Sequence, residues 1–103
     1  MMLASTLLLM IAAPAQVDGS AQRRALVTCF RESVTQAQEQ KRKPAEFEPL
    51  ARERCAAQIT AFRSAVVAFD LRNGRARKAA ESDVDLQVAD YVVSFSERLD
   101  TGS

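Results

Sequence analysis

The chain has 103 residues, of which 48% are hydrophobic and 26% are charged, and its net charge is only +1. This balance argues against a dedicated nucleic-acid-binding protein, which concentrates positive charge on one face. The sequence contains no histidine, so it lacks the commonest general base and the commonest transition-metal ligand. We therefore expect one small domain with no catalytic residue, no metal site and no cofactor.

The first fifteen residues are typical of an export signal. Residues 1–12 carry no charged side chain, and the apolar run over residues 3–13 ends in Ala13-Pro14-Ala15, a small-x-small cleavage site. The run is too short for a membrane-spanning helix, which needs about twenty residues. We predict a cleaved signal peptide over residues 1–15, cleavage between Ala15 and Gln16, and a periplasmic or secreted domain over residues 16–103. No Lys or Arg precedes the run, so the alternative is an apolar tail that stays attached.

After the signal, apolar residues recur at intervals of three and four, and Gly and Pro are scarce, which predicts an all-α domain. The first helix is expected over residues 20–40, with Ser20 as its N-terminal cap. Lys41-Arg42-Lys43-Pro44 then breaks the chain, because the residue before a proline avoids helical angles. The apolar stripe of this helix consists of Leu26, Cys29, Phe30, Val34 and Ala37.

A second helix is expected over residues 46–72, starting somewhere between Pro44 and Pro49. Asn73-Gly74 ends it, since glycine readily takes the left-handed conformation that follows many helices. A third helix is expected over about residues 77–100, starting near Arg77 or at Ser82. Together these elements predict a small up-down-up three-helix bundle. The two remaining stripes consist of Cys55, Ile59, Phe62, Val66 and Phe69, and of Val84, Val88, Tyr91, Val92, Phe95 and Leu99.

Cys29 and Cys55 are the only cysteines. An even cysteine count in an exported protein usually indicates a disulfide, and here only one intramolecular pairing exists. Arg42 is the midpoint between them, so in an antiparallel hairpin that turns there the two cysteines lie at the same height. We predict a structural disulfide between the first two helices. A redox-active or intermolecular pair is the alternative, although the chain has no CxxC arrangement.

Two basic clusters are the candidate surface contacts: Lys41, Arg42 and Lys43 at the first turn, and Arg75, Arg77 and Lys78 after the second helix. They should lie at opposite ends of the bundle, each with acidic residues nearby. We interpret them as solvated helix ends, with contact to anionic lipid as the alternative. The carboxylate pairs Glu46/Glu48 and Asp83/Asp85 have i,i+2 spacing, which points the two side chains of each pair to different sides of a helix.

These features indicate a small exported helical protein without enzymatic activity, acting by interaction or as a structural component. We expect its partner to be another envelope protein or a second copy of itself, held through apolar residues left uncovered, such as Leu71, Leu86 or Val93. The alternative is an envelope protein that binds anionic lipid peripherally through its basic helix ends. Thiol-disulfide chemistry is the enzymatic alternative.

Overall fold

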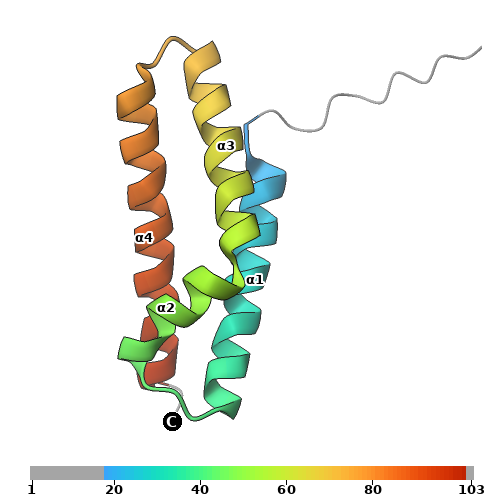
Figure 1. Ribbon diagram of the computed structural model, residues 1–103, viewed down its shortest axis with the longest axis vertical. Coiled ribbons are helices and arrows are strands. Elements are labelled where there is room, and N and C mark those ends of the chain that lie inside the picture. The colour runs from blue at the N-terminus through green and yellow to red at the C-terminus, as the bar shows by residue number, and fades with distance from the viewer. Residues whose placement is uncertain (1–17, 102–103) are drawn as a thin grey trace, which may run out of the picture.

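The protein is described by a computed structural model over residues 18–101, and all regular elements within that range are α-helices (Figure 1). They are α1 (Ser20–Glu39), α2 (Pro44–Arg54), α3 (Ala56–Arg72) and α4 (Arg77–Thr101). Helices α1 and α4 run in the same direction, α3 runs opposite to both, and α2 crosses obliquely at the end where α1 terminates. The predicted signal peptide and its cleavage point lie outside the described residues. The all-α fold is confirmed.

The predicted three-helix bundle is wrong in one respect, because the segment expected as a single helix over residues 46–72 forms two helices. The break is at Cys55, whose backbone angles of φ −104° and ψ 18° lie outside the α-helical region. Hydrogen bonds from Cys55 N–H to the Ala51 carbonyl and from Ile59 N–H to the Cys55 carbonyl persist across it. The chain therefore bends rather than unwinds, and α2 leaves the axis of α3.

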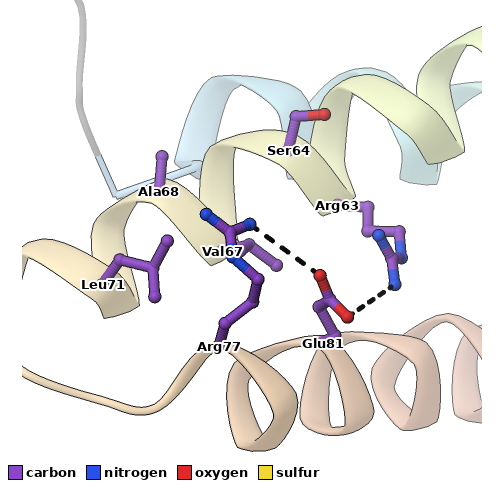
Figure 2. A pocket seen from close by; sticks show the side chains of 7 residues that line it. All are labelled: Arg63, Ser64, Val67, Ala68, Leu71, Arg77 and Glu81. Carbon is purple, nitrogen blue, oxygen red and sulfur yellow. Dashed lines mark ion pairs between the residues drawn. The ribbon is translucent and has the colours of Figure 1, made fainter.

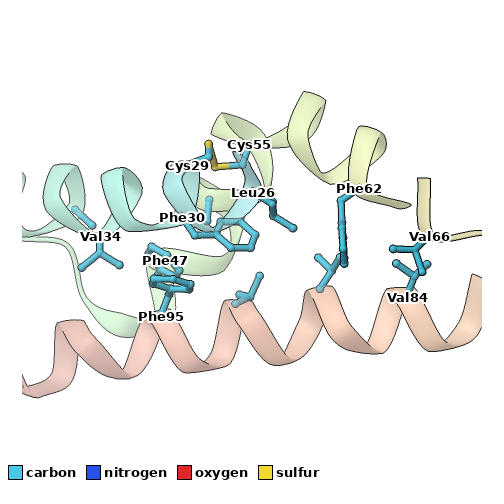
Figure 3. Packing of buried hydrophobic residues seen from close by; sticks show 14 of the residues in the cluster. Leu26, Cys29, Phe30, Val34, Phe47, Cys55, Phe62, Val66, Val84 and Phe95 are labelled. Atoms are coloured by element: carbon cyan, nitrogen blue, oxygen red, sulfur yellow. A yellow bond between two sulfur atoms is a disulfide. The ribbon is translucent and has the colours of Figure 1, made fainter. Parts of the chain in front are cut away.

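Side-chain burial explains the direction of this bend. Phe47 and Ala51, one helical turn apart in α2, are fully buried. Figure 3 shows Phe47 close to Phe95 of α4 and near Phe30 of α1. Because α2 tilts across the bundle, its two buried residues close the end of the core instead of continuing the line of α3. Pro49 lies inside α2 and does not interrupt it; Pro44 occupies the first turn, where the missing N–H costs nothing.

The core combines the predicted stripes with residues that periodicity alone did not reveal. All five predicted residues of α1 are buried, as are Phe62 and Val66 of α3 and five of the six from α4. Ile59, Phe69 and Tyr91 were expected in the core but are only partly buried. The buried hydrophobic residues that the stripes missed are Phe47, Ala51, Val67 and Ala80.

The start of α1 differs from the prediction that Ser20 caps the helix. Gly19 is the N-cap residue, at φ 87°, and the Asp18 carboxylate accepts hydrogen bonds from both the N–H and the hydroxyl of Ser20. These bonds lower the pKa of Asp18. A Cβ on Gly19 would lie 3.0 Å from Cγ2 of Val66. Glycine is needed here both for its left-handed conformation and for the close approach of α1 to α3.

Helices α1 and α3 end in the same backbone motif, with one difference in sequence. After α1, Lys41 takes φ 56° while Arg42 N–H bonds the Ala37 carbonyl; after α3, Gly74 takes φ 84° while Arg75 N–H bonds the Asp70 carbonyl. Both are Schellman motifs, which place a left-handed residue after the helix. Asn73-Gly74 therefore ends the helix as predicted, whereas Lys41 adopts a conformation that is unfavourable for a residue with a Cβ.

Replacing Lys41 with glycine is expected to raise the free energy of unfolding by about 0.5 to 1 kcal/mol, because glycine tolerates this backbone conformation. Urea unfolding of the wild type and Lys41→Gly measures the change. Gly74→Ala is the matched control, because an added Cβ there meets no atom within 4 Å. Its free energy of unfolding is expected to fall by about 1 kcal/mol, and this decrease reflects backbone conformation alone. A lower free energy of unfolding for Lys41→Gly would contradict the left-handed conformation of residue 41.

The Cys29 and Cys55 sulfur atoms lie 2.09 Å apart and their Cα atoms 5.9 Å apart, which confirms that the two cysteines sit at disulfide-bonding distance across the first hairpin (Figure 3). Cys55 is fully buried and Cys29 is 7% exposed. Ser33, a buried polar residue, donates its hydroxyl to the Cys29 carbonyl at 2.8 Å and lies 3.4 Å from the Cys55 sulfur. The cysteine pair thus belongs to the core.

Candidate functional site

A shallow groove runs between α3 and α4, with an apolar floor and a charged rim (Figure 2). The floor includes Val67, Ala68 and Leu71, while Arg63, Arg77 and Glu81 form the rim. The Glu81 carboxylate lies between the two guanidinium groups, 3.9 Å from that of Arg63 and 3.8 Å from that of Arg77. At these distances and with exposed side chains, the ion pairs at the rim of the groove are weak surface pairs.

The best-formed polar contact between α3 and α4 joins Arg63 to Asp85. Arg63 Nε donates to Oδ1 at 2.9 Å and its Nη2 donates to Oδ2 at 3.4 Å, a two-pronged contact. The hydrogen bond to Asp85, followed by the charge of the same carboxylate, raises the pKa of the Arg63 guanidinium. Arg63 therefore links α3 to α4, and its guanidinium group is already paired with a carboxylate.

The basic cluster after α3 is largely neutralised by acidic neighbours. Arg75 donates to Asp70 at 3.0 Å and also to Asp83, and these contacts, led by the hydrogen bond to Asp83, raise the pKa of Arg75. Arg77 pairs with Glu81 one turn later. Lys78 is exposed and makes no ion pair with a described residue. Two of the three predicted contact residues are thus engaged within the molecule.

The cluster at the first turn is organised by the start of α2. The Glu46 carboxylate accepts the Lys43 backbone N–H at 3.1 Å and the Arg42 guanidinium at 3.2 Å. Lys41 and Lys43 are exposed, and neither makes an ion pair within residues 18–99. The two clusters lie at opposite ends of the bundle, where the connections α1–α2 and α3–α4 are found (Figure 1).

Acidification should weaken the start of α2 through Glu46. The Lys43 N–H first, and the Arg42 guanidinium second, lower the pKa of Glu46 from its ordinary value of 4.5. A lowered folded-state pKa stabilises the fold above the unfolded value, and this contribution is lost as pH falls through the folded value. Glu46→Ala should therefore be less stable than the wild type near neutral pH, and the difference should shrink below about pH 4.5.

Urea unfolding at several pH values measures this difference. Glu53→Ala, at an exposed position of the same helix, is the control. A gap between Glu46→Ala and the wild type that stays constant with pH contradicts the capping role.

The carboxylates that the sequence analysis considered as pairs bind different arginines. Glu46 contacts Arg42, and Glu48 contacts Arg52. Asp83 and Asp85 likewise contact Arg75 and Arg63. Each carboxylate holds its own arginine on the surface instead of converging with its neighbour on one point.

A second hollow, on α1, involves residues outside the two basic clusters that were predicted as surface contacts. It is lined by Arg23, Arg24, Val27, Thr28 and Arg31, which we call the α1 arginine face. Arg23 donates to the Tyr91 hydroxyl at 3.0 Å and to the Gln87 side-chain oxygen at 3.3 Å. The signal in the sequence was the recurrence of arginine at seven-residue spacing, 24 and 31, around Val27.

Of the three apolar residues expected to be uncovered, Leu86 and Val93 are exposed, at 61% and 54%. Leu71 is partly buried against the core. Within the described range, no group of three or more His, Cys, Asp and Glu side chains is placed to hold a metal ion. None of the described helices combines the length and apolar character needed to cross a membrane. Comparison with protein-family models, curated proteins and solved structures finds no match to this chain.

Proposed function

We propose that this chain is an exported, non-enzymatic interaction protein, whose disulfide-linked helical domain presents a helix surface to another protein of the cell envelope. The observation that carries the proposal is the position of Cys29 and Cys55, at bonding distance between α1 and the α2–α3 bend. Disulfides persist in oxidising compartments outside the cytoplasm, in agreement with the apolar segment and small-x-small site before Gln16.

Burial of the cysteines supports a structural role over thiol-disulfide chemistry. A reactive cysteine needs access to its substrate and an electropositive surrounding. Cys55 is fully buried, and the nearest polar side chain described for its sulfur is the neutral hydroxyl of Ser33. The exposed helix surfaces instead carry several arginines, a residue type that is enriched in protein interfaces.

Contact of the basic helix ends with anionic lipid, the alternative function, has less support. Arg42, Arg75 and Arg77 already contact carboxylates of the same chain. A lipid headgroup would have to compete with these neighbours. Co-sedimentation with vesicles of anionic lipid tests the alternative: binding that is lost in Lys41→Gln/Lys43→Gln would favour it.

The proposed function is tested in cells by mass spectrometry and site-specific photo-crosslinking. The isolated protein is expected to begin at Gln16 and to be two mass units lighter than its reduced form. A photo-reactive residue at Thr28, Ala45 or Val93, all exposed positions on different helices, is expected to crosslink to one envelope protein from at least one position. A full-length, reduced chain without specific crosslinks overturns the proposal.

A further inference from the structure

Most arginines outside the α1 arginine face pair with carboxylates, whereas the three arginines of the face make no ion pair with a described residue. Elsewhere, the arginines with described ion pairs contact carboxylates on their own or neighbouring helices; they are Arg42, Arg52, Arg54, Arg63, Arg75 and Arg77. Arg24 and Arg31 make no side-chain hydrogen bond or ion pair with residues 18–99. Arg23 donates hydrogen bonds only to the neutral side chains of Tyr91 and Gln87, and its charge also helps to lower the pKa of Asp18. Positive charge is therefore left uncompensated along one face.

Helical geometry places these side chains together. Arg24, Val27, Thr28 and Arg31 follow the three- and four-residue spacing of a single helix face, and they line one hollow with Arg23. Seven residues separate Arg24 from Arg31, which corresponds to about 10 Å along the axis. The face thus offers guanidinium groups at both ends of two helical turns, with a partly buried valine between them.

Arg23 is held in place before any partner binds. Its guanidinium carbon lies 5.2 Å from the centre of the Phe62 ring, and its nitrogens bond Tyr91 and Gln87 of α4. A side chain that is already ordered loses less conformational entropy on binding than a free one. The groups that contact Arg23 directly are uncharged, and Asp18, whose pKa its charge helps to lower, makes no ion pair with it, so the guanidinium remains available to an anion.

We propose that the α1 arginine face binds an acidic segment of the partner protein, with carboxylates spaced by about one or two helical turns. The inference rests on the proposed function and names the surface and the chemistry of the partner. Guanidinium groups suit it because their planar fork donates two parallel hydrogen bonds to a carboxylate. Val27 supplies an apolar contact between the charged ends, as in interfaces that combine a small apolar centre with a polar rim.

The surroundings of the face favour a narrow protein segment over a membrane surface. Segments that bind anionic membranes typically present clusters of about four to eight Lys and Arg, whereas this face has three arginines along one helix. Glu32, which follows Arg31 in α1, lies 3.8 Å from Arg54 of α2 and does not pair with the face. The uncompensated positive charge is confined to a strip along α1 that has the width of one helix.

The test uses a soluble acidic peptide, an oligo-glutamate of about twenty residues, titrated at low salt into the purified disulfide-linked protein and followed by NMR. Shifts are expected at Arg24, Val27, Thr28 and Arg31. Arg24→Gln/Arg31→Gln should weaken binding by about tenfold or more, since it removes both charged ends. The matched control is Arg52→Gln/Arg77→Gln, which changes the net charge equally but removes arginines already paired with Glu48 and Glu81.

If peptide binding is weakened equally in the two double variants, the proposal is overturned, because net charge alone then explains the binding. Absence of saturable binding to the wild type would overturn it as well. Vesicles of phosphatidylglycerol form a third arm: tighter binding to them through the same two arginines would assign the face to a membrane. If an envelope protein crosslinks in cells equally well to the wild type and to Arg24→Gln/Arg31→Gln, this inference fails while the proposed function stands.

Discussion

Replacing Phe47 with alanine is expected to lower the free energy of unfolding by about 3 to 5 kcal/mol, the usual range for removing a buried phenylalanine. Phe47 is fully buried, and its ring is the main apolar group by which α2 reaches the space between α1 and α4 (Figure 3). Without it, α2 keeps only Ala51 as a fully buried anchor. Urea or thermal unfolding measures the loss, and hydrogen exchange should show faster opening of the α2 amides.

Phe69→Ala is the matched control, because it removes the same side chain from the other end of the segment. Phe69 is only partly buried and lies outside the buried core, so we expect a loss of no more than about 1.5 kcal/mol. A single straight helix over residues 46–72 would predict the reverse order, with Phe69 in the core stripe. Similar losses for the two variants, or a larger loss for Phe69→Ala, would contradict the bend at Cys55.

Loss of the disulfide is the second change with a large expected effect. The two cysteines are 26 residues apart, and closing a loop of that length stabilises a fold by about 3.5 kcal/mol in the chain-entropy model. Because a small domain is stable by only about 5 to 10 kcal/mol, Cys29→Ala/Cys55→Ala should unfold at markedly lower temperature. Its circular dichroism below that temperature should remain helical, since the helices have their own apolar faces.

A reducing agent separates the covalent link from the effect of the substitutions themselves. Reduction should lower the unfolding temperature of the wild type by about as much as the double substitution does. The double variant itself should not respond to the reductant. A wild type whose unfolding is unaffected by reduction would show that the bond contributes nothing to stability. Alanine is preferred to serine here, because Cys55 is fully buried and a new hydroxyl there would need a partner.

Several features of the fold could be predicted from local sequence, each for a local reason. The periodic apolar residues predicted α1 and α4 close to their observed bounds, because helical spacing repeats within each segment. Asn73-Gly74 predicted the end of α3 through the backbone freedom of glycine at φ 84°. The equal distance of Cys29 and Cys55 from the turn predicted that the sulfur atoms would meet.

The surface was harder to predict, since an ion pair depends on which helix lies opposite. Arg63 and Asp85 are on different helices and meet only because α3 and α4 pack side by side. Arg75 and Arg77 were predicted as candidate contacts at a solvated helix end with acidic residues nearby, and both pair with acidic residues in the fold. Arg24 and Arg31 belong to neither predicted basic cluster, yet neither pairs with a carboxylate among residues 18–99.

The sequence by itself thus determined the all-α class, the C-terminal ends of α1 and α3 and the cysteine pairing, because each follows from spacing along one chain. Only the tertiary structure decided that the middle segment bends at Cys55, that Phe47 rather than Phe69 enters the core, and that the α1 arginine face stays uncompensated. The physical reason is common to all three. Burial and charge pairing depend on the space and the groups that a neighbouring helix offers, and these are set by packing.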